Sequence, residues 1–154
     1  MRKTILSALL LAAAPFAAAA MDVTADPSAI KWGPGPAALP PGAQVAVISG
    51  DPGSNGPYVI RARLPAGYTV PPHTHPTDEN VTVISGTFHF AMGATLDKSK
   101  GDAVKAGGFF RAEQGMQHYA WADGPAEIQV HGMGPFAITY VNPADDPRAA
   151  TAKK

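Results

Sequence analysis

The sequence predicts an all-β domain whose short strands form a sandwich or a barrel. At least eight apolar or alternating segments are separated by glycine and proline turn signals every eight to twelve residues. Glycine and proline contribute 16 residues each, which is below a disordered composition and suits many tight turns. No convincing helical pattern follows residue 20, and a rolled sheet also removes exposed strand edges.

The strands can be placed in order along the chain. In the first half we expect strands at residues 44–49, 58–64, 81–84 and 87–92, with an extended segment at 71–79. Residues 93–108 are polar and predict a solvated loop that contains one short strand. In the second half we expect strands at residues 109–111, 118–121, 127–131 and 136–141, each set off by glycine or proline.

The N-terminus has the pattern of an export signal. Arg2 and Lys3 precede an apolar run at residues 5–14, and three alanines at 18–20 form a cleavage site after Ala20. We therefore expect a periplasmic or secreted protein without a membrane span after cleavage, because the run is short for a span. A retained anchor is the alternative.

The mature chain divides into three parts. Residues 21–43 predict an irregular, proline- and glycine-rich arm laid over the domain, with Trp32 as its one large anchor. Residues 44–141 predict a single β domain, and residues 142–154 a flexible C-terminal tail.

Charge and composition exclude several classes of partner and chemistry. The formal net charge is zero, and no basic stripe is present, so a nucleic acid partner is not expected. The chain contains no cysteine, which excludes disulfides, thiolate metal sites and cysteine nucleophiles.

One short segment carries the chemistry. His73 and His75 are two residues apart, and Glu79 follows four residues later, so in an extended strand all three side chains share a face. Three prolines in residues 71–76 argue against a helix there. Two imidazoles and a carboxylate on one face are good ligands for a divalent transition metal.

The same segment resembles the cupin superfamily. The pattern G-x5-H-x-H-x3-E-x6-G, at residues 67–86, matches the first cupin motif at every fixed position. The second motif is matched from Gly107 to His118, except that Glu113 replaces its proline and Ala122 its asparagine. The resemblance covers about residues 44–141.

The resemblance implies a single cupin jelly-roll β-barrel with a metal inside. His73, His75 and Glu79 would ligate from one strand and His118 from a facing strand. The metal would be one divalent ion of Mn, Fe, Zn, Ni or Cu, among which the sequence does not choose. A cupin that keeps its shape and lacks the metal is the alternative.

Other polar and aromatic residues leave their roles open. If the polar face of its strand lined the cavity, His131 would support a metal ligand or contact a substrate, and otherwise it would be a surface or hydrogen-bonded histidine. His89 is expected on the exterior face, and Glu113 in a solvated turn, with an extra carboxylate near the cavity as the alternative for Glu113. Five aromatic residues could rim a ligand pocket or pack in the core, namely Tyr68, Phe110, Tyr119, Trp121 and Tyr140.

Three functions fit these observations. The first is an exported metalloenzyme, a dioxygenase-type oxidoreductase acting on a small organic compound, with no separate acid or base assigned. The second is a non-catalytic periplasmic module that binds or senses a ligand or metal, since the chain is also similar to the cupin domain of ChrR-type anti-sigma factors. The third is a structural homodimer with an apolar, metal-free interior.

Overall fold

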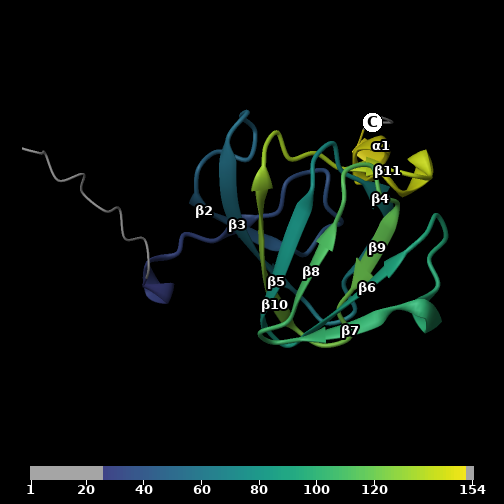
Figure 1. Cartoon of the computed structure of the whole chain (residues 1–154), viewed down its shortest axis with the longest axis horizontal. Coiled ribbons are helices and arrows are strands. Elements are labelled where there is room, and N and C mark those ends of the chain that lie inside the picture. The colour runs from purple at the N-terminus through teal and green to yellow at the C-terminus, as the bar shows by residue number, and fades with distance from the viewer. Residues whose placement is uncertain (1–25, 152–154) are drawn as a thin grey trace, which may run out of the picture.

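The computed structural model describes residues 26–151. The predicted signal peptide, the first residues of the predicted arm and the last three residues of the predicted tail lie outside this range. Within it, regular structure is almost entirely β, arranged as two antiparallel sheets that face each other (Figure 1). This confirms the predicted all-β, jelly-roll class.

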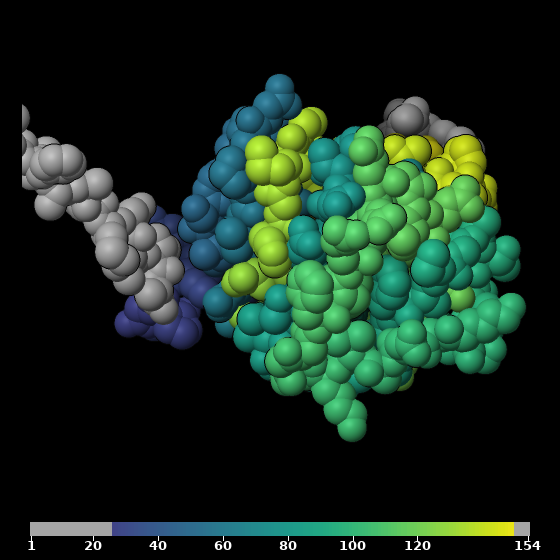
Figure 2. Space-filling view, in the orientation of Figure 1, coloured from purple at the N-terminus to yellow at the C-terminus, as the bar shows by residue number. Residues whose placement is uncertain are grey.

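The larger sheet has the strand order β1-β2-β3-β10-β5-β8. Every neighbouring pair in it is antiparallel. Figure 2 shows β3, β10, β5 and β8 side by side on the front of the molecule. The strands are β1 (Gly33–Pro34), β2 (Gln44–Ser49), β3 (Pro57–Leu64), β5 (Glu79–Ser85), β8 (Phe109–Ala112) and β10 (Ala126–Met133).

The smaller sheet has the order β11-β4-β9-β6-β7 and is also antiparallel throughout. Its strands are β4 (Thr69–Thr74), β6 (Thr87–Met92), β7 (Asp102–Lys105), β9 (His118–Trp121) and β11 (Thr139–Tyr140). The chain passes from β4 in this sheet to β5 in the larger one, and back again to β6. This alternation places the residues around each crossing at the space between the sheets.

The hydrophobic core fills that space, because the inward face of each long strand is apolar. Along β10, Ile128 and Val130 point inward and are buried, while Glu127 and Gln129 lie on the outer face. The core draws on both sheets, with Val81 and Val83 from β5 and Tyr68 and Phe88 from the smaller sheet's side. Fully burying each of the larger apolar side chains stabilises the fold by about 1.5–3 kcal/mol.

Two expectations for the C-terminal part need correction. The strand predicted at 136–141 is reduced to Thr139–Tyr140, because the backbone amide of Phe136 binds the carbonyl of Pro52 in a loop rather than in a ladder.

A short helix, α1 (Pro147–Thr151), also forms where no helix was expected. Asp146 caps its start by accepting from the backbone N–H of Arg148 at 2.9 Å, and Pro147 suits a first helical position. Three single-turn 3-10 helices complete the described elements, η1 (Pro27–Ala29), η2 (Lys98–Lys100) and η3 (Pro143–Asp145).

The segment before β2 lies against the domain and is held there by tyrosines. The hydroxyl of Tyr68 donates to the carbonyl of Pro40, and that of Tyr140 to the carbonyl of Ala38, each at 2.7 Å. Trp32 lies 3.9 Å beneath the guanidinium of Arg63, which is a cation–π contact. The arm therefore covers one side of the space between the sheets. The exact domain boundaries stay a prediction.

No helix among residues 26–151 is long and apolar enough to cross a membrane. Export and cleavage after Ala20 stay predictions, since residues 1–20 are not described.

The turn at Gly86 offers a stability test of the fold. Gly86 has φ +76°, and a Cβ there would overlap the carbonyl oxygen of Pro125. Gly86→Ala is expected to lower the free energy of unfolding by about 2–4 kcal/mol, from left-handed strain plus the clash. Urea unfolding measures this. Gly124→Ala is the matched control, because a Cβ there meets nothing within 4 Å, and it should change stability by less than about 0.5 kcal/mol. Equal effects of the two substitutions would contradict this account of the turn.

Candidate metal centre

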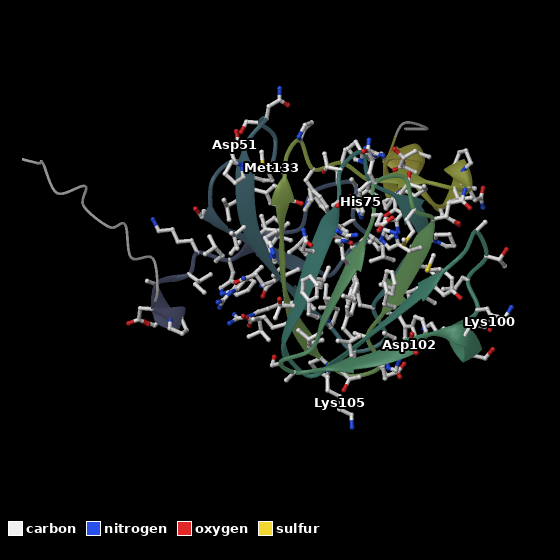
Figure 3. All side chains as sticks on the ribbon, in the orientation of Figure 1. Asp51, His75, Lys100, Asp102, Lys105 and Met133 are labelled. Carbon is white, nitrogen blue, oxygen red and sulfur yellow. The ribbon has the colours of Figure 1, made fainter. Side chains whose placement is uncertain are left out.

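Four predicted side chains come together at one end of the space between the sheets. His73 lies in β4 directly opposite His118 in β9, with ring centroids 4.2 Å apart. His75 follows β4, and Glu79 is the first residue of β5. All four are buried. In Figure 3, His75 lies inside the ribbon, whereas Lys100 and Lys105 point away from it.

Two prolines explain how His73 and His118 come into register. Pro71 and Pro72 have no backbone N–H, so neither can donate to a neighbouring strand. The pairing of β4 with β9 is accordingly interrupted between Val70 and His73, and it resumes at His73 opposite His118. The irregular stretch sets the inward direction of His73.

The expected arrangement of the four residues is wrong in two respects. Glu79 does not share a strand with His73 and His75, because a bend at Pro76 and Thr77 takes the chain across to the other sheet. His118 is on the strand next to β4 in the same sheet, not on a facing strand. The carboxylate, not His118, therefore approaches from the opposite sheet.

Backbone carbonyls fix the orientation of all three imidazole rings. The Nδ1 atom of His73 contacts the carbonyl of Pro71 at 2.7 Å, and that of His75 contacts the carbonyl of Ala137 at 2.7 Å. The Nδ1 of His118 contacts the carbonyl of Met116 at 3.0 Å. A carbonyl oxygen only accepts, so Nδ1 carries the hydrogen in each contact. Each neutral ring then presents its Nε2 lone pair as a ligand, an arrangement typical of metal-binding histidines.

The unpaired atoms that result fit a bound cation. One ring nitrogen from each of the three histidines lies within 4.8 Å of the other two. The Nε2 atoms of His75 and His118 are buried without a hydrogen-bond partner. One oxygen of Glu79 is 3.5 Å from each of these two atoms. With all three rings neutral, three lone pairs and a carboxylate face one another, which is a ligand set suited to a divalent transition metal.

The pKa values of these groups reflect burial and mutual contact. Burial, with repulsion from His118 and His75, lowers the pKa of His73 to about 3. Burial acts in the same direction on His75, but its contact with the Glu79 carboxylate outweighs it, and the pKa of His75 is raised. Burial opposes ionisation of Glu79, but the contacts with His118 and His75 hold the pKa of Glu79 well below its usual value.

These shifts give the metal affinity a defined pH dependence. In the metal-free protein the contact with Glu79 raises the pKa of His75 and so favours its protonated form, and this proton must leave when a metal binds. Affinity should therefore fall as pH falls through the raised pKa of His75, by about tenfold per pH unit for each proton released. Titration against a chelating dye between about pH 5 and pH 8 measures this. Occupancy unchanged at about pH 4.5 would show that these histidines do not hold the metal.

An apolar cavity of about 60 Å³ adjoins the four groups. By volume it holds only a few water molecules. Its walls are aliphatic and aromatic apart from the four site residues and Tyr68, whose hydroxyl is already bound to Pro40. The cavity therefore offers hydrogen-bonding or ligating atoms only at the end where the three histidines and Glu79 meet.

Comparison with known families agrees with this geometry. Residues 20–137 match the profile of the ChrR Cupin-like domain. The chain belongs to the ChrR cupin-like family. No curated protein sequence matches it.

Solved structures with the same fold span several activities. A candidate acetylacetone dioxygenase from Methylibium petroleiphilum PM1 has TM-score 0.63 and 18% identity, covering 86% of this chain and 90% of that one. The polyketide cyclase RemF from Streptomyces resistomycificus has TM-score 0.56 and 16% identity, covering 71% and 78%. KdgF from Halomonas sp. has TM-score 0.52 and 17% identity, covering 69% and 86%. At these identities the likeness shows the cupin fold alone.

The other histidines of this cupin lie away from the cavity. The polar face of β10 is the outer face of the sheet, so His131 lies there and is no partner of the four site residues. Glu127 on that face pairs with Arg63 at 3.0 Å. His89 lies on the face of β6 opposite Phe88, stacked on Trp121 with centroids 4.8 Å apart.

The remaining predicted residues divide between core, cavity wall and surface. Glu113 is exposed and pairs with Arg111 at 2.6 Å. Tyr68 and Phe110 line the cavity, whereas Tyr119 and Trp121 form a separate buried cluster with Ala91. Tyr140 has its ring centroid 6.1 Å from that of His73.

Phe136 is a cavity residue that nothing in the sequence singles out. Phe136 stacks on His75, with centroids 4.8 Å apart and rings 23° from parallel, and it also lines the cavity. Its distance of 61 residues along the chain from His75 gives no sequence signal of this contact. Phe136 is next to Ala137, whose carbonyl orients the same His75 ring, and only the fold brings both residues to His75.

Proposed function

We propose that this cupin is an exported metalloprotein that acts on a small organic compound, most specifically as a dioxygenase-type oxidoreductase. The observation that carries the proposal is the meeting of three imidazole lone pairs and the Glu79 carboxylate at one end of an apolar cavity. His73, His75, Glu79 and His118 would hold the ion, as the cupin motifs imply.

A metal held by four protein groups would keep coordination positions open. At these positions it would act as a Lewis acid and could bind an organic oxygen ligand together with dioxygen. The chain's own residues do the rest. The carbonyls of Pro71, Ala137 and Met116 orient the rings. The apolar wall excludes water from the bound compound and strengthens its interaction with the charged centre. The small cavity favours a compact compound.

The proposal is tested by oxygen consumption. The protein is loaded separately with Fe²⁺, Mn²⁺, Ni²⁺, Cu²⁺ and Zn²⁺ and assayed under air with a panel of small ketones, diketones and phenols. We expect turnover with at least one redox-active metal, and its loss in His75→Ala. Metal-loaded protein that is inert with every compound would count against an enzyme.

A non-catalytic role in binding or sensing is the second candidate, and the family match favours it, because that family is defined by the cupin domain of ChrR. In that case the loaded protein would show thermal shifts with small ligands and no turnover.

Export, a homodimeric state and the absence of a nucleic acid partner remain part of the proposal. Secretion of a fusion that carries residues 1–20 tests the first, and sedimentation the second.

A further inference from the structure

A second hollow lies on the outside of the domain, against the arm. It has a volume of about 390 Å³ and is bounded by the arm, by the turn after β2 and by strands β2 and β3. We call it the arm groove. Its lining residues are Pro34, Pro36, Leu39, Val45, Val47, Pro52, Gly53, Ile60 and Phe136. None of these residues has a polar side chain.

The arm groove and the metal cavity share a wall. Leu39, Val45, Ile60 and Phe136 line both. Leu39 is on the arm, which the two tyrosine hydroxyls hold at Ala38 and Pro40 on either side of it. Leu39 is therefore the arm side chain that lies between the two hollows.

The polar hollow beside His131 lacks this connection. It is lined by residues such as Asp78, Asn80 and Gln114, and it shares no lining residue with the metal cavity. A ligand that enters along the arm groove meets only apolar side chains until it reaches the four site residues.

We propose that the ligand of this site is an amphiphile, with an oxygen-donor head at the metal and an unbranched apolar tail that passes Leu39 and lies in the arm groove. This inference rests on the proposed metal site and names the class of compound it takes. The metal cavity alone, at about 60 Å³, has room for the head and little more. The exposed Val47, with 56% of its surface accessible, forms part of the floor that the tail would cover.

Alkyl hydroxamates test the proposal, because the head binds a metal and the tail length can be varied. The chain is loaded with Zn²⁺, and acetohydroxamate through decanohydroxamate are titrated by calorimetry. Affinity should rise about three- to fourfold for each methylene that enters the arm groove, so that octanohydroxamate binds at least about 30-fold more tightly than acetohydroxamate.

Two variants locate the tail. Val47→Glu places a charge in the arm groove and should remove most of the gain with tail length, leaving acetohydroxamate affinity unchanged. Leu96→Glu is the matched control, since Leu96 is 42% accessible in the loop before η2 and lines neither hollow, and it should leave both affinities unchanged.

The contrary outcomes are distinct. If the protein binds zinc and acetohydroxamate, but the affinity for hydroxamates does not depend on tail length, this inference is overturned and the metal site stands. A dimer that Val47→Glu abolishes, again without a tail effect, would assign the arm groove to a second copy of the chain and overturn it as well. A chain that binds no zinc would contradict the proposed function, and the inference with it.

Discussion

Replacing His75 by alanine is expected to lower the affinity for divalent metal by more than about 100-fold. Changes to groups that merely orient a ligand cost about 10- to 100-fold in affinity, so loss of a ligand should cost more. His75 is also the ring that Phe136 and the Ala137 carbonyl hold in place, so the substitution removes an already oriented ligand. Competition against a chelator of known affinity measures the change.

Two other histidines provide matched controls. His131→Ala and His89→Ala also remove an imidazole, but from the outer face of β10 and from the stack on Trp121. Each should change metal affinity by less than about threefold, since neither ring adjoins the four site residues. A His75→Ala protein that binds metal as tightly as these controls would show that the cluster is not the metal site.

Removal of the metal is expected to lower Tm by about 10 °C. A ligand that binds only the folded state at 100 times its Kd adds about 2.7 kcal/mol of stability. In a domain of this size, each kcal/mol corresponds to a few degrees. The physical source is the cluster itself, where the Nε2 atoms of His75 and His118 are buried without a hydrogen-bond partner in the metal-free protein.

Glu79→Gln isolates the contribution of the carboxylate to this stabilisation. Gln keeps nearly the same shape but removes the negative charge that lies 3.5 Å from each of two imidazoles. Metal-induced stabilisation measured by calorimetry at a fixed metal concentration should fall to less than about half. A metal-induced rise in Tm that is equal in Glu79→Gln and in the unaltered protein would exclude Glu79 as a ligand.

The sequence identified the site residues better than it identified their arrangement. Residue spacing located His73 and His75 correctly on one inward face, because alternation is a local property of an extended strand. The same reasoning failed for Glu79, since the bend at Pro76 and Thr77 moves the chain to the other sheet. The position of His118 next to β4 depends on sheet order, which no local pattern encodes.

The fold class followed from turn spacing and strand composition, but the packing of distant segments did not. The polar alternation of β10 left open which face was inside, and the arginines of β3 that pair with Glu127 on the outer face decide it. The arm looked irregular in sequence. Its closure over the cavity depends on tyrosine hydroxyls from Tyr68 and Tyr140, whose partners are 28 and 102 residues away.

The most direct test of the metal centre is an anomalous difference map from crystals of the metal-loaded protein, recorded at the absorption edge of the bound metal. The account predicts one strong peak per chain, about 2.0–2.2 Å from Nε2 of His73, His75 and His118, with a Glu79 oxygen as the fourth protein ligand. A peak elsewhere in the chain would contradict this arrangement. So would the absence of a peak near these rings in protein that carries stoichiometric metal.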